Sequence, residues 1–128
     1  MIGLDTNVLV RYLAQDDRAQ AAAATALIEN QCTEDNAGFV GLVVLAEVAW
    51  VSESSYGASR AEVADIVKRI LSTRQLVVQD AEVAWQSLRQ FESGRADFAA
   101  CLIRCSAEAA GCHQVVSFDK PSGMTLLK

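Results

Sequence analysis

The chain has 128 residues, of which 52% are hydrophobic and 21% charged, and its formal net charge is −5. This length and composition suit one globular domain spanning residues 1–128 and exclude a disordered or low-complexity protein. The negative charge argues against a broad basic surface for nucleic acid. Without a basic leader or an apolar run of roughly 20 residues, we expect a cytoplasmic protein with no membrane association.

The spacing of apolar residues predicts strands that alternate with helices along the whole chain. A short buried strand is expected at residues 2–5, followed by a helix from Thr6. Ser59 and Glu62 form a capping-box pattern, and Asp80 stands where it can cap a helix. Further helices are expected at about 16–31, 42–56, 59–71, 80–94 and 98–111, and further strands at 39–40, 75–78, 115–118 and 124–127. This alternation is typical of an α/β fold with a parallel sheet covered on both faces.

Two aspartates come at the ends of predicted strands. Asp5 ends the first strand, and Asp119 follows the strand at 115–118. Ligand sites of parallel sheets lie at the carboxyl ends of the strands, so we expect these two carboxylates at one edge of the sheet. A turn-forming role is the alternative for Asp119.

Two further acids are notable for their surroundings. Glu47 lies in the segment GLVVLAEVAWV, where its neighbours one helical turn away are all apolar. A carboxylate buried there must be paired or metal-bound, unless only its methylenes pack and its head reaches water. Asp97 precedes a predicted helix, where capping alone would explain it. Four converging acids would repel one another without a cation, and Mg²⁺ or Mn²⁺ suits oxygen ligands.

Other catalytic chemistries have little support in the sequence. His113 is the single histidine and comes just before a predicted strand, so we interpret it as a surface residue. The four cysteines show no C-x-x-C pairs, which favours reduced thiols over a zinc site or a disulfide framework. No nucleophile–histidine triad and no glycine-rich phosphate loop are evident.

Four segments of the chain, LDTNVLVRYL, LVVLAEVAWV, ADFAACLI and VSFDK, resemble in order and spacing the conserved segments of PIN-domain ribonucleases. They most resemble the VapC toxins of type II toxin–antitoxin pairs. The resemblance implies a single PIN-like domain, an α/β/α sandwich with a central parallel sheet of four to five strands. It also implies a Mg²⁺- or Mn²⁺-dependent endoribonuclease, with RNA as substrate, a small antitoxin protein as partner, and a homodimer.

The same resemblance assigns roles to residues by position. The catalytic acids would be Asp5, Glu47, Asp97 and Asp119. All of these except Glu47 would bind the metal, and Thr6 and Asn7 would support Asp5 through a hydroxyl or an amide. Basic residues near the acidic edge in the predicted topology are candidates for RNA contact, namely Arg11, Arg95 and Lys120.

The chain departs from the PIN pattern at Ala100, where relatives usually carry a second aspartate, commonly a metal ligand. Alanine cannot bind a metal, so we expect a weakened or inactive enzyme. The loss fits natural drift or a substitution introduced so that a toxic nuclease can be produced. The main alternative is a catalytically degraded PIN-like module that only binds an antitoxin or RNA. A dehalogenase-type phosphatase would need an aspartate where Asn7 stands, and a response-regulator receiver leaves Glu47 unexplained.

Overall fold

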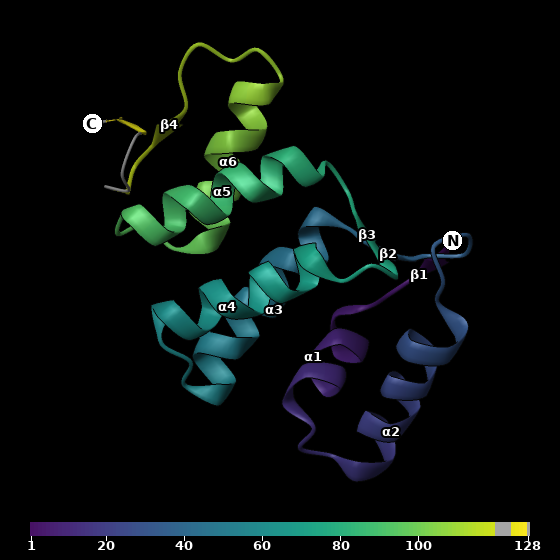
Figure 1. Ribbon diagram of the computed structural model, residues 1–128. Helices are drawn as coiled ribbons and strands as arrows, with labels where there is room; N and C mark the ends of the chain where they lie inside the picture. The colour runs from purple at the N-terminus through teal and green to yellow at the C-terminus, as the bar shows by residue number, and fades with distance from the viewer. Residues whose placement is uncertain (120–123, 128) are drawn as a thin grey trace.

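The computed structural model describes residues 1–119 and 124–127, in which strands and helices alternate (Figure 1). The strands are β1 (Ile2–Gly3), β2 (Gly38–Val40), β3 (Leu76–Val78), β4 (Val116–Ser117) and β5 (Thr125–Leu126). The helices are α1 (Thr6–Ala14), α2 (Arg18–Ala26), α3 (Leu42–Tyr56), α4 (Arg60–Ser72), α5 (Ala81–Ser93) and α6 (Phe98–Ala109). A π-helical turn, η1 (Leu27–Gln31), extends α2. Within the described residues, no helix has the length and apolarity needed to cross a membrane.

The strands form two separate parallel ladders. One is a sheet in the order β1-β2-β3, and the other pairs β4 only with β5. The mixed α/β class and the parallel pairing predicted from the sequence are confirmed, but the strands are divided between two sheets. In Figure 1, β4 lies in the part of the chain that follows α6 and is separate from β1, β2 and β3. Strands of two or three residues contain too little pattern to specify which neighbour they pair with.

The core centres on α3, which contacts α1, α4 and α6. Its buried side chains Leu45 and Val48 are fully enclosed by residues of these neighbours and of the sheet. Gly38 in β2 permits close packing there, because a Cβ at this position would lie 2.8 Å from a Leu4 methyl and 2.9 Å from one of Leu76. The glycine therefore leaves room for the Leu4 and Leu76 side chains to pack directly against the backbone of β2.

The starts of α2, α4 and α5 differ in how they are capped. Ser59 and Glu62 form the predicted capping box of α4, with both reciprocal hydrogen bonds present. Asp17 caps α2, which therefore begins slightly later than predicted. Asp80 precedes α5 in a left-handed conformation with φ of 46°, and its side chain makes no capping hydrogen bond. The prediction that this aspartate caps α5 is therefore wrong, because the left-handed backbone replaces the extended conformation that capping requires.

Candidate functional site

The end of β1 and the middle of α3 are joined through Thr6. Asp5 is exposed and occupies the N-cap of α1, where its Oδ1 accepts a hydrogen bond from the Thr6 backbone N–H at 2.8 Å. The buried Thr6 hydroxyl donates to Glu47 Oε1, also at 2.8 Å. Two of the predicted acids, 42 positions apart in the sequence, thus flank one threonine. Thr6 thus contacts Asp5 through its backbone N–H, whereas its hydroxyl contacts Glu47.

Glu47 is exposed to solvent, although its sequence neighbours are apolar. The apolar residues on this side of α3 are exposed with it: Val43 has 75% and Trp50 67% of its surface accessible. Of the two interpretations, the structure favours a Glu47 whose carboxylate reaches water over a buried and paired carboxylate. The unusual feature is the exposed apolar surface beside the carboxylate. Asn7 is likewise exposed on α1.

Asp97 lies at the start of α6, beside α3. Its Oδ1 accepts a hydrogen bond from the Ala100 backbone N–H at 2.7 Å, so it is the N-cap of the helix. Asp97 and Phe98 line a pocket of about 300 Å³ together with residues of α3, including Ala46, the residue before Glu47. The third acid is thus held against the helix that carries the second. Ala100 occupies the first turn of α6 and contributes only its backbone to the cap.

The loop that leads to Asp97 is held by Arg60, a residue that the sequence did not mark. The Arg60 guanidinium donates hydrogen bonds to backbone oxygens at the end of α5 and in the loop, among them Gly94 O at 3.1 Å and Ala96 O at 2.9 Å. It also lies 4.0 Å from the centroid of the Phe91 ring. A cation there satisfies carbonyls at the end of a helix and fixes the approach to Asp97. No sequence signal reveals it, because its partners are backbone atoms more than 30 positions away.

Asp119 lies apart from the other acids. It follows β4, which pairs only with β5, and its backbone N–H is bonded to the Ser117 hydroxyl at 3.1 Å. The prediction that Asp5 and Asp119 share one sheet edge is therefore wrong for the described residues. The cause lies in β4, whose Val116 is 51% exposed, and in the next apolar residue, Phe118, which is 77% exposed, so this segment adds little buried surface to any sheet.

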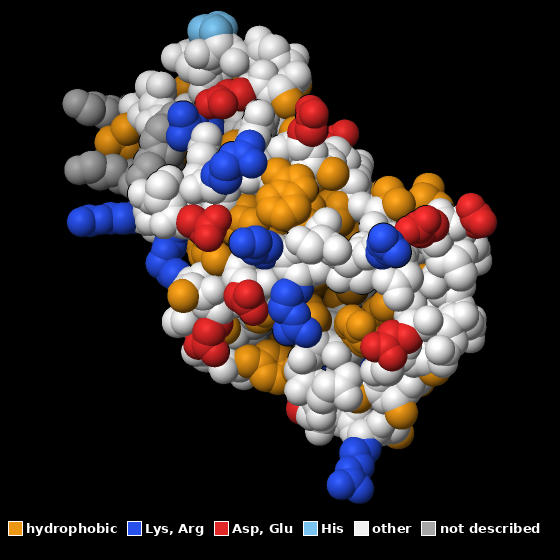
Figure 2. Space-filling view, in the orientation of Figure 1, with side chains coloured by type: hydrophobic (Ala, Val, Ile, Leu, Met, Phe, Trp, Pro, Cys, Tyr) orange, Lys and Arg blue, Asp and Glu red, His pale blue; other side chains and the backbone are white. Residues whose placement is uncertain are grey.

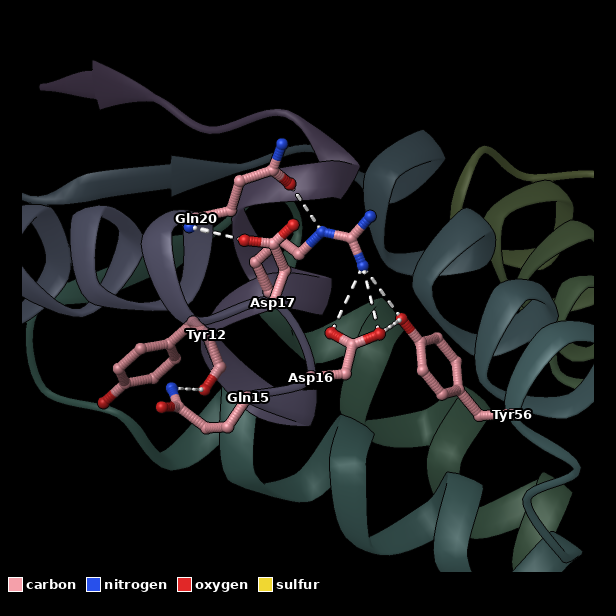
Figure 3. A network of polar contacts seen from close by, with 7 residues as sticks. Tyr12, Gln15, Asp16, Asp17, Gln20 and Tyr56 are labelled. Carbon is pink, nitrogen blue, oxygen red and sulfur yellow. Dashed lines mark hydrogen bonds and ion pairs between the residues drawn. The ribbon is translucent and has the colours of Figure 1, made fainter.

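The three basic residues predicted to contact RNA have different surroundings. Arg11 is engaged within the protein: it pairs with Asp16 at 3.2 Å and also donates to Gln20 and Tyr56. Figure 3 shows this network, which ties α1 to α2 and α3. Arg95 is exposed, and Lys120 lies outside the described residues. On the face in Figure 2, blue and red side chains are interspersed, with no continuous basic stripe.

The chemistry of the site suits a hard divalent cation. Within the described residues, no three of the side chains of histidine, cysteine, aspartate or glutamate converge as a metal site. Mg²⁺ commonly needs only one or two protein carboxylates and completes its coordination with water and substrate phosphates. Asp5 and Glu47 are exposed carboxylates that both contact Thr6, and each offers an oxygen ligand of the kind that such an ion prefers. The residues present therefore fit a magnesium-like ion bound through few protein contacts.

The cysteines do not contribute to this site. Cys32, Cys101 and Cys105 are buried free thiols, and Cys112 is exposed. Burial raises the pKa of the Cys101 thiol, and the neighbouring Cys105 adds to this effect. A thiol with a raised pKa is a poor nucleophile and metal ligand, so Cys101 acts as a small core residue.

Comparison with known proteins places this arrangement in a family. A search of the curated proteins and a search of the solved structures returned no match. The PIN domain model matches residues 2–121, which is nearly the whole chain. PIN domains are in general metal-dependent nucleases, are common in toxin–antitoxin systems and usually use divalent ions. The exposed acids at the end of β1, on α3 and at the start of α6 stand within the matched region, and the chain belongs to the PIN domain family.

Proposed function

We propose that the protein is a Mg²⁺- or Mn²⁺-dependent endoribonuclease, the VapC-type toxin of a toxin–antitoxin pair in the cytoplasm, with activity weakened by Ala100. The observation that supports this most directly is the chain of contacts from Asp5 through Thr6 to Glu47. Both carboxylates are exposed and contact Thr6, which closely follows the end of a parallel strand, and ligand sites of such sheets lie at that end, which supports the proposal.

Each acid in this proposal has a defined part. Asp5 and Glu47 would hold the ion, and Asp97 would approach it from the neighbouring helix. Because Asp97 Oδ1 is committed to the helix cap, Oδ2 is the oxygen that would help to hold the ion or a bound water. A bound divalent ion supplies a Lewis acid for the phosphodiester and a water of lowered pKa. Thr6 fixes the orientation of Glu47, and Arg60 fixes the loop before Asp97.

A groove on the other side of α3 suits the proposed antitoxin. It has a volume of about 610 Å³, lies between α1, α3 and α4, and has an apolar floor that includes Val10, Leu13 and Ile66. Acidic residues Glu62 and Asp65 also line it. An amphipathic antitoxin helix with basic residues beside its apolar face would match both features.

The proposed homodimer has a different candidate surface. The exposed apolar residues around β4 and β5 would lose water contact against a second copy, namely Val116, Phe118, Leu126 and Leu127.

The experiment that tests the nuclease proposal restores the missing acid. RNA cleavage is measured with Mg²⁺ and with Mn²⁺ for the chain as it stands and for Ala100→Asp. Because a further carboxylate one turn into α6 strengthens cation binding, we expect Ala100→Asp to raise cleavage by orders of magnitude. Asp5→Asn in the Ala100→Asp background is the control and should remove the gain.

The alternative is a degraded module that binds an antitoxin or RNA without cutting it. It is favoured by Ala100 itself and by the absence of a three-residue metal cluster among the described residues. If Ala100→Asp cuts RNA with neither ion while the protein still binds RNA or a partner, the binding module is the correct description.

A further inference from the structure

A pocket next to the proposed catalytic acids contains an exposed tryptophan. Its volume is about 300 Å³, and α3 contributes Trp50, Glu53 and Ser54, with Ala46 and Ala49 at its base. The start of α6 closes it with Asp97, Phe98 and Ala99. This volume is at the lower end of the range of about 300–1,000 Å³ found for ligand sites. Trp50 lines the pocket and is 67% exposed, so its side chain lies outside the core and is accessible from solvent.

The position of the pocket relates it to the site. Trp50 lies three residues after Glu47, so the two side chains lie one helical turn apart on the same side of α3. Asp97 belongs both to the pocket and to the proposed acid set. A group bound against Trp50 would therefore be a neighbour of the phosphate to be cut.

The charge of the pocket limits what it can bind. Among the described residues that line the pocket, none is a lysine or an arginine, whereas two are acidic, Glu53 and Asp97. A phosphate would be repelled by these carboxylates. A flat, uncharged ring with N–H donors on its edge would stack on the indole and donate to a carboxylate. An unpaired nucleobase has these properties.

We propose that this pocket binds an unstacked base of single-stranded RNA next to the scissile phosphate, with Trp50 as the stacking platform. The inference rests on the proposed ribonuclease function and names the part of the substrate that the pocket recognises. Glu53 would accept hydrogen bonds from the exocyclic amino groups of adenine, cytosine or guanine. Uracil has no exocyclic amino group, and its one edge donor, N3–H, stands between two carbonyl oxygens that the carboxylate repels, so the pocket would disfavour uracil.

The test measures binding of short single-stranded RNA oligomers in Mg²⁺ by fluorescence polarisation. The probes are oligomers of adenosine, cytidine and uridine, and an abasic ribose-phosphate oligomer that keeps the phosphates without bases. We expect Trp50→Ala to weaken binding of the adenosine oligomer roughly tenfold, because aromatic stacking typically contributes about that much per base. Trp50→Phe, which keeps an aromatic ring, should retain most of the affinity.

The matched control is Ile103→Ala, which removes a side chain that is 58% exposed on α6 and outside the pocket. It should bind as the parent does. The abasic oligomer should bind equally to the parent and to Trp50→Ala. Glu53→Gln should reduce the preference for adenosine and cytidine over uridine, since an amide offers both a donor and an acceptor.

The outcomes separate the inference from the proposed function. If Ala100→Asp cuts RNA but Trp50→Ala binds the adenosine oligomer as tightly as the parent, the base pocket is wrong and the nuclease stands. An equal loss of adenosine and abasic oligomers in Trp50→Ala would also overturn the base pocket. If no oligomer binds and Ala100→Asp does not cut, both proposals fail.

Discussion

Asp5 and Asp119 both follow short strands, but they differ in the packing of those strands and in their hydrogen bonds. Asp5 follows β1, where the nearby residues Leu4 and Val40 are buried. It caps α1, and the first residue of that helix, Thr6, donates a hydrogen bond to Glu47. Asp119 follows a strand of a two-stranded ladder whose apolar residues are exposed. Its backbone N–H donates a hydrogen bond to the Ser117 hydroxyl, two positions away. An acid is placed accurately for chemistry when the residues behind it are packed and bonded to distant parts of the chain.

The largest expected effect compares these two aspartates directly. In the Ala100→Asp background, Asp5→Asn should lower the rate of RNA cleavage by at least about 100-fold, since removing even a residue behind a metal ligand typically costs roughly 10–100-fold. Asp119→Asn should lower it much less, because β4 lies outside the main sheet. The measurement compares the RNA cleavage rates of the two variants at the same Mn²⁺ concentration. Equal losses would mean that β4 joins the main sheet during catalysis.

The second test concerns the acid at the start of α6. Arg60→Met should lower both the free energy of unfolding, by about 2 kcal/mol, and the cleavage rate of the Ala100→Asp protein, because several backbone carbonyls before Asp97 lose a cationic donor. Urea unfolding and the cleavage assay measure the two effects. Arg60→Lys should recover part of each, since an ammonium group still satisfies some of these carbonyls. Arg89→Met, an exposed residue of α5, is the matched control and should change neither.

A smaller effect is expected where Asp5 and Glu47 are joined. Thr6→Val keeps the shape of a buried side chain but removes the hydroxyl that donates to Glu47, so we expect a loss of about 1 kcal/mol in the free energy of unfolding. Cleavage should fall as well, because Glu47 loses its orientation. Thr6→Ser, which retains the hydroxyl, should keep most of the cleavage rate. A Thr6→Val protein that cuts as fast as its parent would show that this contact has no part in the site.

The smallest effect tests the network that anchors α1 behind Asp5. The Tyr56 hydroxyl donates to Asp16 at 2.8 Å, and this hydrogen bond, aided by Arg11, holds the pKa of Asp16 below its usual value. A pKa lowered by folding stabilises the protein above the unfolded value of about 3.9, and this stabilisation is lost as the pH falls through the folded value. Asp16→Asn should therefore be less stable than the parent at neutral pH, and the difference should shrink below about pH 4.

Urea midpoints measured across this pH range test the Asp16 prediction, with Asp35→Asn in an exposed loop as the control. A difference that stays constant from neutral to acid pH would exclude the titration of Asp16 as its cause.

Local features were predictable from the sequence, and long-range ones only where several signals agreed. The capping box at Ser59 depends on residues three apart, so the pattern alone was sufficient. The sequence indicates Glu47 because a charged residue interrupts an apolar helix, although the structure shows that the neighbouring apolar side chains are exposed. The pairing of β4 and the contacts of Arg60 depend on segments that are distant in sequence, and no residue type there marks its partner.

The cap of α6 has a consequence for how such a site can be lost over generations. Asp97 caps a helix in addition to its proposed part in holding the ion, and replacing it by alanine would cost about 1 kcal/mol of folding free energy. Position 100 gives the fold only a backbone N–H, and alanine is the residue that helices tolerate best. Selection for a folded protein would therefore retain an acid at position 97, whereas it would not distinguish aspartate from alanine at position 100 on the basis of the cap. A substitution at residue 100 can thus change the metal-binding chemistry of such a site while the cap of α6 stays intact.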